Sequence, residues 1–195
     1  MKRTTLRIHD RMASSRANGP GTRAVLWVQG CTLGCPGCFN PETHPARGGS
    51  VHPVSDLLNW LLALEGSIEG VTISGGEPLQ QPLSLARLLR GIRRQSDLTV
   101  VLFTGYEWKE LPSVVASDEV LAHVDVVVSG RYRADQHHAR GLLGSRNQRL
   151  HFLSSRYRRA DFESIPTAEL VVDPDGGVVQ TGIDPPNLSV ARGWS

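Results

Sequence analysis

All three cysteines of the 195-residue chain fall within eight residues, in the segment Cys31-Thr-Leu-Gly-Cys35-Pro-Gly-Cys38. Thiolates from one short loop can bind three corners of a [4Fe–4S] cluster, a cofactor that usually takes four cysteine ligands. Because the chain has no fourth cysteine, one iron is left for a ligand of another kind. The spacing therefore predicts a cluster with one iron open to chemistry.

Two other kinds of cysteine site fit the same segment. A zinc site takes four Cys and His ligands, or three and a water, and His44 could complete such a set. The usual zinc pattern has two separated ligand pairs, however, whereas here three cysteines share one loop. A Cys35-Pro-Gly-Cys38 redox pair also fits but leaves Cys31 without a role. Spacing alone leaves both alternatives open, and the odd cysteine count argues against a disulfide framework.

Length and composition narrow the class of protein. The 195 residues, of which 39% are hydrophobic, predict a single domain over residues 1–195 with enough apolar material for a core. No apolar run is long enough to span a membrane, and the charged N-terminus lacks the apolar region of a secretory signal. Free cysteines without an export signal predict a cytoplasmic location.

The arginines are distributed unevenly. Eight arginines and a single acid, Asp135, lie between Arg131 and Arg159, although the net charge of the chain is only +2. Such a segment is either a solvated basic face or a docking surface for an acidic partner or a phosphorylated substrate. Nucleic acid is disfavoured as the partner, because the aromatic residues of this segment form no evident stacking platform.

Short apolar runs alternate with helical patterns, which predicts βα units and a parallel sheet. Strands are expected at residues 24–28, 70–74, 98–103 and 124–128, and helices at residues 54–64, with Ser55 as N-cap, and 83–92. A further helix is predicted around residues 107–116, where Pro112 interrupts the pattern. Short late strands are expected at residues 149–153, 169–172 and 178–179, the last two as a hairpin, followed by a loosely held tail after Ile183.

The four long predicted strands each end in a loop of unusual composition. These loops are the cysteine segment, Gly75-Gly76-Glu77-Pro78, Thr104-Gly105-Tyr106 and Ser129-Gly130-Arg131. Ligands of parallel α/β sheets bind at the carboxyl ends of the strands, so we expect all four loops at one site. The two glycines would let backbone approach a ligand closely, and Glu77 would offer a carboxylate to a ligand ammonium group. The alternative for Glu77 is a capping acid in a plain strand-to-helix turn.

The cysteine segment and the Gly-Gly-Glu segment together resemble the radical S-adenosylmethionine (SAM) superfamily. Cys31, Cys35 and Cys38 match its Cys-x3-Cys-x2-Cys signature, and Gly75 to Pro78 match its Gly-Gly-Glu-Pro signature. The resemblance implies an α/β fold of the radical SAM type, a partial (βα) barrel of about five or six βα units.

The same resemblance implies the cofactors and the residues that bind them. The three cysteines would ligate the catalytic [4Fe–4S] cluster, and SAM would chelate its open iron through amino and carboxylate groups. Gly75, Gly76 and Glu77 would bind the SAM amino group, with Thr104 and Ser129 as further cofactor contacts. One electron from the reduced cluster would cleave SAM to methionine and a 5′-deoxyadenosyl radical, which abstracts hydrogen from a substrate.

A narrower likeness extends from about residue 18 to residue 182 and implies a domain core there, with loosely held ends. Residues 18–23 resemble the entry segment of glycyl-radical-enzyme activases, and residues 35–44 resemble the activating subunit of anaerobic ribonucleotide reductase. The likeness implies a glycyl radical protein as partner, such as the anaerobic ribonucleotide reductase large subunit, and a flavodoxin or ferredoxin as electron donor. Two alternatives remain: a stand-alone radical SAM enzyme acting on a small metabolite or peptide, and a zinc-binding or redox module without SAM chemistry.

Three positions depart from the pattern of these families. Asn18 and Ser129 stand where an aspartate is usual, and Gly37 stands where much of the superfamily has an aromatic residue. A serine hydroxyl can hydrogen-bond a ribose or a carboxylate but carries no charge. Arg23 and Arg131 are candidates to pair with the SAM carboxylate or a substrate acid, with solvent exposure as the alternative.

Overall fold

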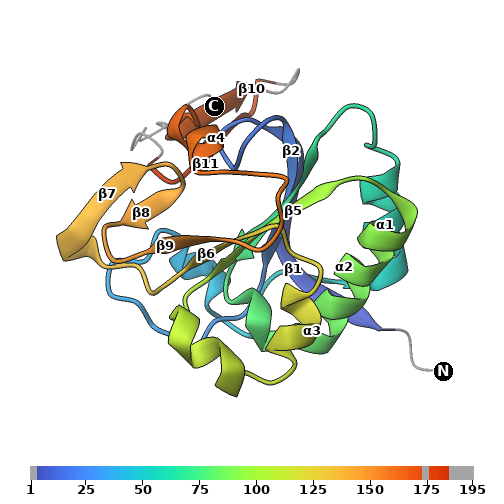
Figure 1. Ribbon diagram of the computed structural model, residues 1–195, viewed down its shortest axis with the longest axis horizontal. Helices are drawn as coiled ribbons and strands as arrows, with labels where there is room; N and C mark the ends of the chain where they lie inside the picture. Colours follow the sequence, from blue (N-terminus) through green and yellow to red (C-terminus); the bar gives the residue numbers. More distant parts are fainter. Residues whose placement is uncertain (1–3, 173–175, 185–195) are drawn as a thin grey trace, which may run out of the picture.

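Seven strands form one sheet in the order β3-β1-β2-β4-β5-β6-β9 (Figure 1). This computed structural model describes residues 4–172 and 176–184. The strands of the sheet are β1 (Thr5–Ser15), β2 (Arg23–Val28), β3 (Ser50–Pro53), β4 (Gly70–Gly75), β5 (Thr99–Thr104), β6 (Val126–Ser129) and β9 (Arg149–Phe152). Strands β2, β4, β5 and β6 are parallel, whereas β1 pairs antiparallel with β2 and β3, and β9 with β6. The protein therefore has a mixed α/β fold around a parallel centre.

Helices α1 (Val54–Leu62), α2 (Pro82–Gln95) and α3 (Ser117–Leu121) connect the successive parallel strands. The apolar residues of α2 recur at helical spacing and are buried in the larger core, with the strand residues that face them. A Cβ on Gly91 of α2 would lie 2.6 Å from Leu58 Cδ2 of α1, so the glycine allows the two helices to pack closely. The three helices thus cover one face of the sheet.

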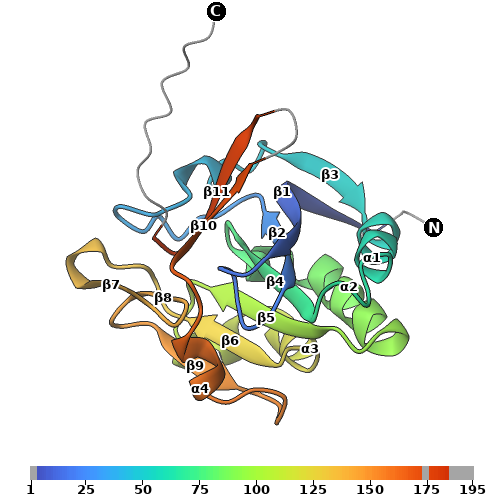
Figure 2. The same cartoon turned by 90° about the horizontal axis from the view of Figure 1, so that it is seen from above.

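Shorter elements complete the chain. They are the hairpins β7 (His137–Arg140) to β8 (Leu143–Ser145) and β10 (Ala168–Val172) to β11 (Val178–Gly182), the helix α4 (Ala160–Glu163), and the 3₁₀ helices η1 (Pro41–Thr43), η2 (Pro78–Gln80), η3 (Trp108–Ser113) and η4 (Ala134–Gln136). Leu142 and Phe162 form a second apolar cluster with Val101, Val126 and Val128 of the sheet. Figures 1 and 2 both show the β7–β8 hairpin at the opposite side of the molecule from α1 and α2.

Most of the predicted elements are confirmed, with shifted ends. The four predicted long strands correspond to β2, β4, β5 and β6, and the two long helices to α1 and α2. Around residues 107–116 the chain forms the 3₁₀ helix η3, with Pro112 inside it, in place of the expected helix. The last two strands pair as the expected hairpin, but its turn at residues 173–175 and the tail from residue 185 lie outside the described residues.

Three expectations were wrong. Three helical crossovers join four parallel strands, which is fewer than the five or six βα units expected. The reason is that the basic segment forms the β7–β8 hairpin and no crossover helix. Strand β9 therefore pairs antiparallel with β6. Residues 5–15 are not loosely held: they form β1, which pairs on both sides and buries Leu6 and Ile8. Pro53, not Ser55, is the N-cap of α1.

No helix in residues 4–172 or 176–184 is long and apolar enough to cross a membrane.

Candidate active site

The cysteine segment follows β2 directly and is held at its base by backbone hydrogen bonds. Gly30 N donates to Thr43 O at 2.7 Å, and Cys31 N donates to His44 O at 3.1 Å, so the loop folds back onto η1. The three cysteines are unbonded and half-buried. His44, the candidate fourth zinc ligand, accepts the hydrogen bond from Cys31 N through its backbone carbonyl.

The cysteines lie close enough together for the charge of one thiolate to raise the pKa of another. Burial raises the pKa of the Cys31 and Cys38 thiols. The charges of Glu77 and Cys35 raise the pKa of Cys31 further, and the charges of Cys35 and Cys31 do the same for Cys38. Because the thiolate is the metal-binding form, iron would displace these protons on binding. Within the described ranges no three His, Cys, Asp or Glu side chains gather around a single metal ion, whereas the thiolates of a cubane each bind a different iron. Three soft, unbonded thiols on one loop therefore fit a cluster.

The Gly-Gly-Glu segment is joined to the end of β2 by its backbone. Gly76 N donates to Val28 O at 2.8 Å, and Glu77 N donates to Gly30 O at 2.9 Å. A Cβ on Gly75 would lie 2.6 Å from Val28 O, and a Cβ on Gly76 would overlap Gly30 O. Gly75 is therefore required for the close approach to the end of β2, and Gly76 for the approach to Gly30, the residue that precedes the first cysteine.

The carboxylate of Glu77 points into the protein. Its Oε1 accepts hydrogen bonds from Leu79 N and Thr104 Oγ1, both at 2.9 Å, and its Oε2 accepts one from Gly105 N at 2.7 Å. The side chain is only 1% exposed, and burial raises the pKa of Glu77 to about 7 against the opposing effect of these hydrogen bonds. The carboxylate thus connects the loops after β4 and β5, as well as capping η2, and does not offer itself to a ligand ammonium group.

The ends of β5 and β6 are joined in the same way. Gly130 N donates to Thr104 O at 3.0 Å and to Tyr106 O at 2.9 Å. A Cβ on Gly105 would overlap the Leu33 side chain of the cysteine segment, so this loop packs directly on the cysteine loop. The structure therefore brings all four predicted loops together at one end of the sheet.

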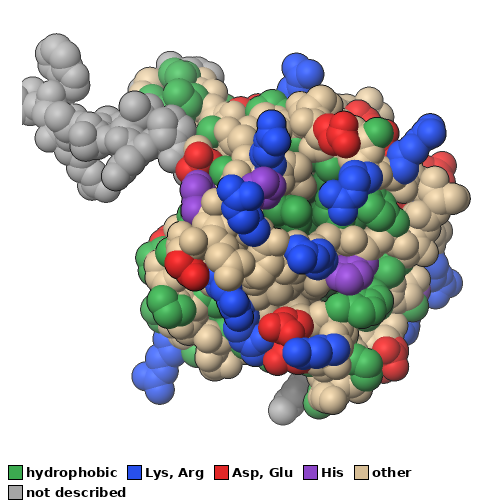
Figure 3. Space-filling model, turned by 60° about the vertical axis from the view of Figure 1, so that its left-hand side comes forward, with side chains coloured by type: hydrophobic (Ala, Val, Ile, Leu, Met, Phe, Trp, Pro, Cys, Tyr) green, Lys and Arg blue, Asp and Glu red, His purple; other side chains and the backbone are tan. Residues whose placement is uncertain are grey.

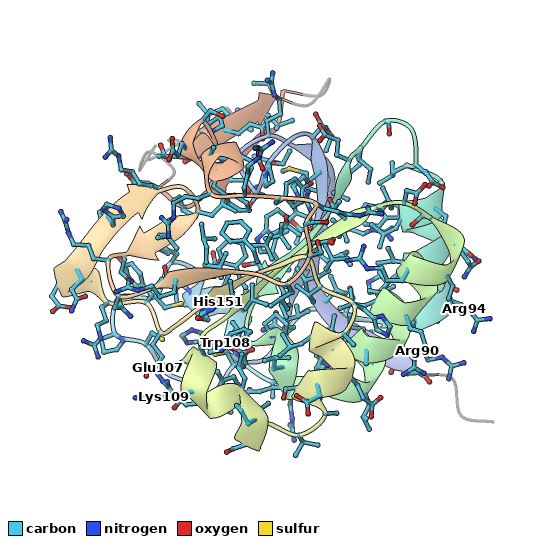
Figure 4. The ribbon with its side chains drawn as sticks, viewed as in Figure 1. Arg90, Arg94, Glu107, Trp108, Lys109 and His151 are labelled. Carbon is cyan, nitrogen blue, oxygen red and sulfur yellow. The ribbon has the colours of Figure 1, made fainter. Side chains whose placement is uncertain are left out.

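Ser129 is buried and its hydroxyl is engaged by a residue that the sequence analysis did not single out. Ser129 Oγ lies 2.9 Å from His151 Nε2, and the His151 ring stacks on Trp108 with ring centroids 4.0 Å apart. Figure 4 shows His151 of β9 beside Trp108 of η3. Because side chains alternate between the two faces of a strand, Ser129 and Val127 of β6 point to the same face of the sheet. Val127 packs in the larger core, on the face that the helices cover. The Ser129 hydroxyl therefore points toward η3.

Gln80 is a further residue that the sequence analysis missed. Its Oε1 accepts from Thr32 N at 3.1 Å, and its Nε2 donates to Thr32 Oγ1 at 2.7 Å, inside the cysteine segment. The sequence did contain a signal for this role. Gln80 lies two residues after the Gly-Gly-Glu-Pro sequence, and a glutamine side chain at that point is long enough to reach the neighbouring loop.

The two candidate arginines have different environments. Arg23 begins β2, at the end of the strand opposite the cysteines; it is fully buried and donates to hydroxyl and carbonyl oxygens of Thr72, Thr99 and Tyr157, among others. Both interpretations of Arg23, as a SAM contact or an exposed residue, were wrong. Arg131 lies beside the site and pairs with Glu110 at 2.6 Å.

Comparison with known proteins decides between the alternatives for the cysteines. Residues 17–151 match the family model described as a 4Fe-4S single cluster domain. The anaerobic ribonucleoside-triphosphate reductase-activating protein of Enterobacteria phage T4 is 34% identical over 137 residues, which cover 68% of this chain and 85% of that protein. The protein of the same name from Escherichia coli (strain K12) is 32% identical over 143 residues, covering 70% and 92% of the two chains.

A second kind of activating enzyme is also similar. The pyruvate formate-lyase-activating enzyme of Clostridium pasteurianum is 35% identical over 126 residues, covering 63% of this chain and half of that enzyme. With the cysteine segment and the Gly-Gly-Glu segment joined at one end of the sheet, the matches assign the cofactors and the class of chemistry. The chain belongs to the 4Fe-4S single cluster domain family and is a radical SAM enzyme of the glycyl-radical-enzyme activating type, which uses a [4Fe–4S] cluster and SAM.

Proposed function

We propose that this enzyme installs a glycyl radical on an anaerobic ribonucleoside-triphosphate reductase. The lengths of the matches support this choice among glycyl radical proteins. They cover 85% and 92% of two reductase-activating proteins but only 50% of the pyruvate formate-lyase-activating enzyme. A flavodoxin or ferredoxin is the proposed electron donor.

Cys31, Cys35 and Cys38 hold the cluster in this proposal, and the backbone of Gly75, Gly76 and Glu77 receives the SAM amino group. The observation that carries it is the direct bonding of the two segments, since Glu77 N lies 2.9 Å from Gly30 O, one residue before the first cysteine. A ligand of the open iron would therefore lie against the Gly-Gly-Glu backbone. When bound, the reduced cluster supplies the electron that cleaves SAM and so generates the hydrogen-abstracting radical.

Thr104 and Ser129 support SAM binding indirectly in this proposal. The Thr104 hydroxyl is bonded to Glu77, and the Ser129 hydroxyl to His151. Both side chains therefore hold the loops in place and leave backbone groups to face the cofactor. The charge that an aspartate would bring at residue 129 is absent, so backbone contacts carry more of the affinity for SAM.

We propose that the open sheet acts as a partial barrel with lateral access. Strands β3 and β9 form opposite edges of the sheet and do not pair with each other. A glycine carried on a loop of a large protein can reach the site only if the side of the barrel is open. This geometry suits a protein substrate.

The test is anaerobic reconstitution followed by radical detection. The protein should take up about four irons per chain, cleave SAM under reducing conditions, and produce a glycyl radical signal by electron paramagnetic resonance when the reductase of the same genome is added. Cys35→Ser is the matched control and should give neither product. SAM cleavage without a signal on a competent reductase would refute the choice of partner and favour a small metabolite or peptide substrate.

A further inference from the structure

A hollow of about 330 Å³ lies between the β7–β8 hairpin, β9 and α4. Its basic lining consists of His138, Arg140 and Arg159, and both arginines are exposed. Its apolar lining consists of Leu143, Leu150 and Phe162, of which Phe162 is 1% exposed. The hollow thus has a cationic rim and an apolar floor, with Gly141 and one acid, Glu163, completing the lining.

The arginines of the segment 131–159, two of which line the hollow, have few acidic partners. Of the eight arginines between residues 131 and 159, Arg131 pairs with Glu110 and Arg156 with Asp97. The other six, including Arg140 and Arg159, form no ion pair within the described part of the chain. Figure 3 shows Lys and Arg side chains spread over this side of the molecule, with Asp and Glu side chains between them. The rim of the hollow therefore carries two arginines whose charge is not neutralised by an ion pair with any described residue.

The turn of the β7–β8 hairpin adopts an uncommon backbone conformation. Ala139 has φ 48°, Gly141 has φ 56° and Leu142 has φ 68°. Positive φ is costly for residues with a Cβ and is found where the surrounding structure enforces it, frequently at functional sites. Here the enforcing contact is the Leu142 side chain, which is 1% exposed in the second apolar cluster. The buried leucine fixes the turn that carries Arg140.

The other side of the hairpin packs on the cysteine loop. The Phe39 ring, next to Cys38, lies 4.2 Å from the Tyr132 ring and 6.0 Å from the His137 ring. A Cβ on Gly144 would lie 2.7 Å from Phe39 Cε2, so β8 also approaches this ring closely. Because neighbouring strand residues face opposite sides, His137 contacts the cysteine loop while His138 lines the hollow. The hairpin therefore separates the hollow from the cysteines by one layer of side chains.

We propose that this basic face docks an acidic segment of the glycyl radical partner, with a carboxylate in the hollow and a neighbouring apolar side chain on its floor. This inference rests on the proposed function for the identity of the partner. Arg140 and Arg159, which form no ion pair within the described residues, supply the charge complementarity, and arginine binds carboxylates in a bidentate manner. A segment docked here lies one hairpin away from the cysteine loop, which places a nearby glycine loop within reach of the radical.

The test compares two double charge reversals that change the net charge equally. Arg140→Glu with Arg159→Glu removes the basic rim of the hollow. Arg87→Glu with Arg94→Glu is the matched control on α2, where Figure 4 labels Arg94 on the far side of the molecule. All four arginines are exposed, and thermal melting checks that both variants fold.

Two measurements are made on each reconstituted protein. The first is the apparent KM for the anaerobic ribonucleoside-triphosphate reductase, read from the glycyl radical signal. The rim variant should raise this KM about tenfold and the control less than about twofold, with partner-free formation of 5′-deoxyadenosine unchanged in both. The second is the binding of a fluorescent polyglutamate peptide by anisotropy, which requires no radical chemistry. The wild type and the control should bind the peptide, and the rim variant should not.

Equal effects of the two variants on both measurements would overturn the docking proposal. If the wild type cleaves SAM but activates no reductase, only the proposed partner fails, and the peptide measurement still decides whether the surface binds acidic chains. Displacement of the peptide by inorganic phosphate, but not by chloride at the same ionic strength, would show a site for free phosphate and would also overturn the proposal. Arg140→Lys with Arg159→Lys should retain most of the peptide binding.

Discussion

Thr104 Oγ1 donates a 2.9 Å hydrogen bond to Glu77 Oε1, and both side chains are buried at the carboxyl ends of the neighbouring parallel strands β5 and β4. Gly105 N binds the other carboxylate oxygen at 2.7 Å, while Glu77 N reaches Gly30 O at 2.9 Å. One residue therefore connects the loops after β2, β4 and β5. This connection determines how the cysteine segment and the Gly-Gly-Glu segment sit relative to each other.

Glu77→Gln should destabilise the protein although it preserves the size of the side chain. Leu79 N donates to one carboxyl oxygen and Gly105 N to the other, so in either orientation the new amide NH₂ would face an N–H group. The protonated acid present below a pKa of about 7 still accepts from both N–H groups, because its own O–H can be taken up by the rotatable Thr104 hydroxyl. We expect a loss of about 1–3 kcal/mol in the free energy of unfolding, measured by denaturant titration of the apoprotein. Glu119→Gln, at an exposed ion pair, is the control and should change it by less than about 1 kcal/mol. Equal effects of the two changes would contradict the role assigned to Glu77.

The pH dependence of stability should report the same buried carboxylate. The native protein holds the Glu77 proton up to a pKa of about 7, whereas the unfolded chain releases it near the ordinary value of 4.5. The stabilisation from this group is therefore complete below pH 4.5 and is lost as the pH rises to about 7, by about 3 kcal/mol in all. Denaturant titrations of the wild type and Glu77→Gln across this range test the prediction. A difference between the two that does not vary with pH would refute it.

Gly76→Ala should lower the amount of iron that the reconstituted protein retains, an effect that a glycine substitution elsewhere in the chain should not have. The added Cβ would overlap Gly30 O, so the Gly-Gly-Glu segment must move away from the base of the cysteine loop. We expect iron content after reconstitution to fall by at least about half, because the loop loses its fixed position. Gly66→Ala is the control: its φ of 89° makes the change strained, but nothing lies within 4 Å of the new Cβ. It should lower the melting temperature without lowering the iron content.

The organisation of the site was predictable to a large extent because its signals are local. Cys31, Glu77, Thr104 and Ser129 each follow an apolar run, and the rule that parallel strands end at one edge brings such residues together. The structure confirms this convergence of loops. The directions of the side chains were not predictable, because they depend on contacts between loops distant in sequence, such as that of Glu77 with Gly105.

The elements that the sequence analysis missed depend on tertiary pairing. Strand β1 has apolar residues at Leu6 and Ile8 but polar residues along most of its remaining length, so its sequence alone resembles a charged terminus. It forms a strand because β2 and β3 pair with its two sides. The hairpin β7–β8 likewise has no apolar alternation, and the burial of Leu142 stabilises it. Local sequence patterns do not indicate pairings of this kind, because the pairings depend on residues distant in the chain.

Cys35→Ser should abolish cluster binding without unfolding the apoprotein. The cysteine is half-buried and lies outside both apolar clusters, so its thiol contributes little to the core. We expect the reconstituted variant to retain almost no iron, since serine replaces a soft thiolate ligand. The melting temperature of the apoprotein should stay within about 2 °C of the wild type. A matched loss of both iron and apoprotein stability would indicate that the thiol has a structural role.

Arg23→Lys should lower stability and leave SAM binding intact, because this buried arginine lies at the end of β2 away from the cysteines. Arg23 donates to oxygens of Thr72, Thr99 and Tyr157, and burial lowers its pKa against the opposing effect of Tyr157. A lysine cannot satisfy this set of acceptors with one ammonium group, so we expect a loss of about 2–4 kcal/mol in the free energy of unfolding. Arg131→Lys, at a half-buried ion pair beside the site, is the comparison and should cost less than about 1 kcal/mol. Denaturant titration and SAM affinity of the reconstituted proteins provide the two readouts. If Arg23→Lys weakened SAM binding while leaving stability unchanged, the structural assignment of this arginine would be wrong.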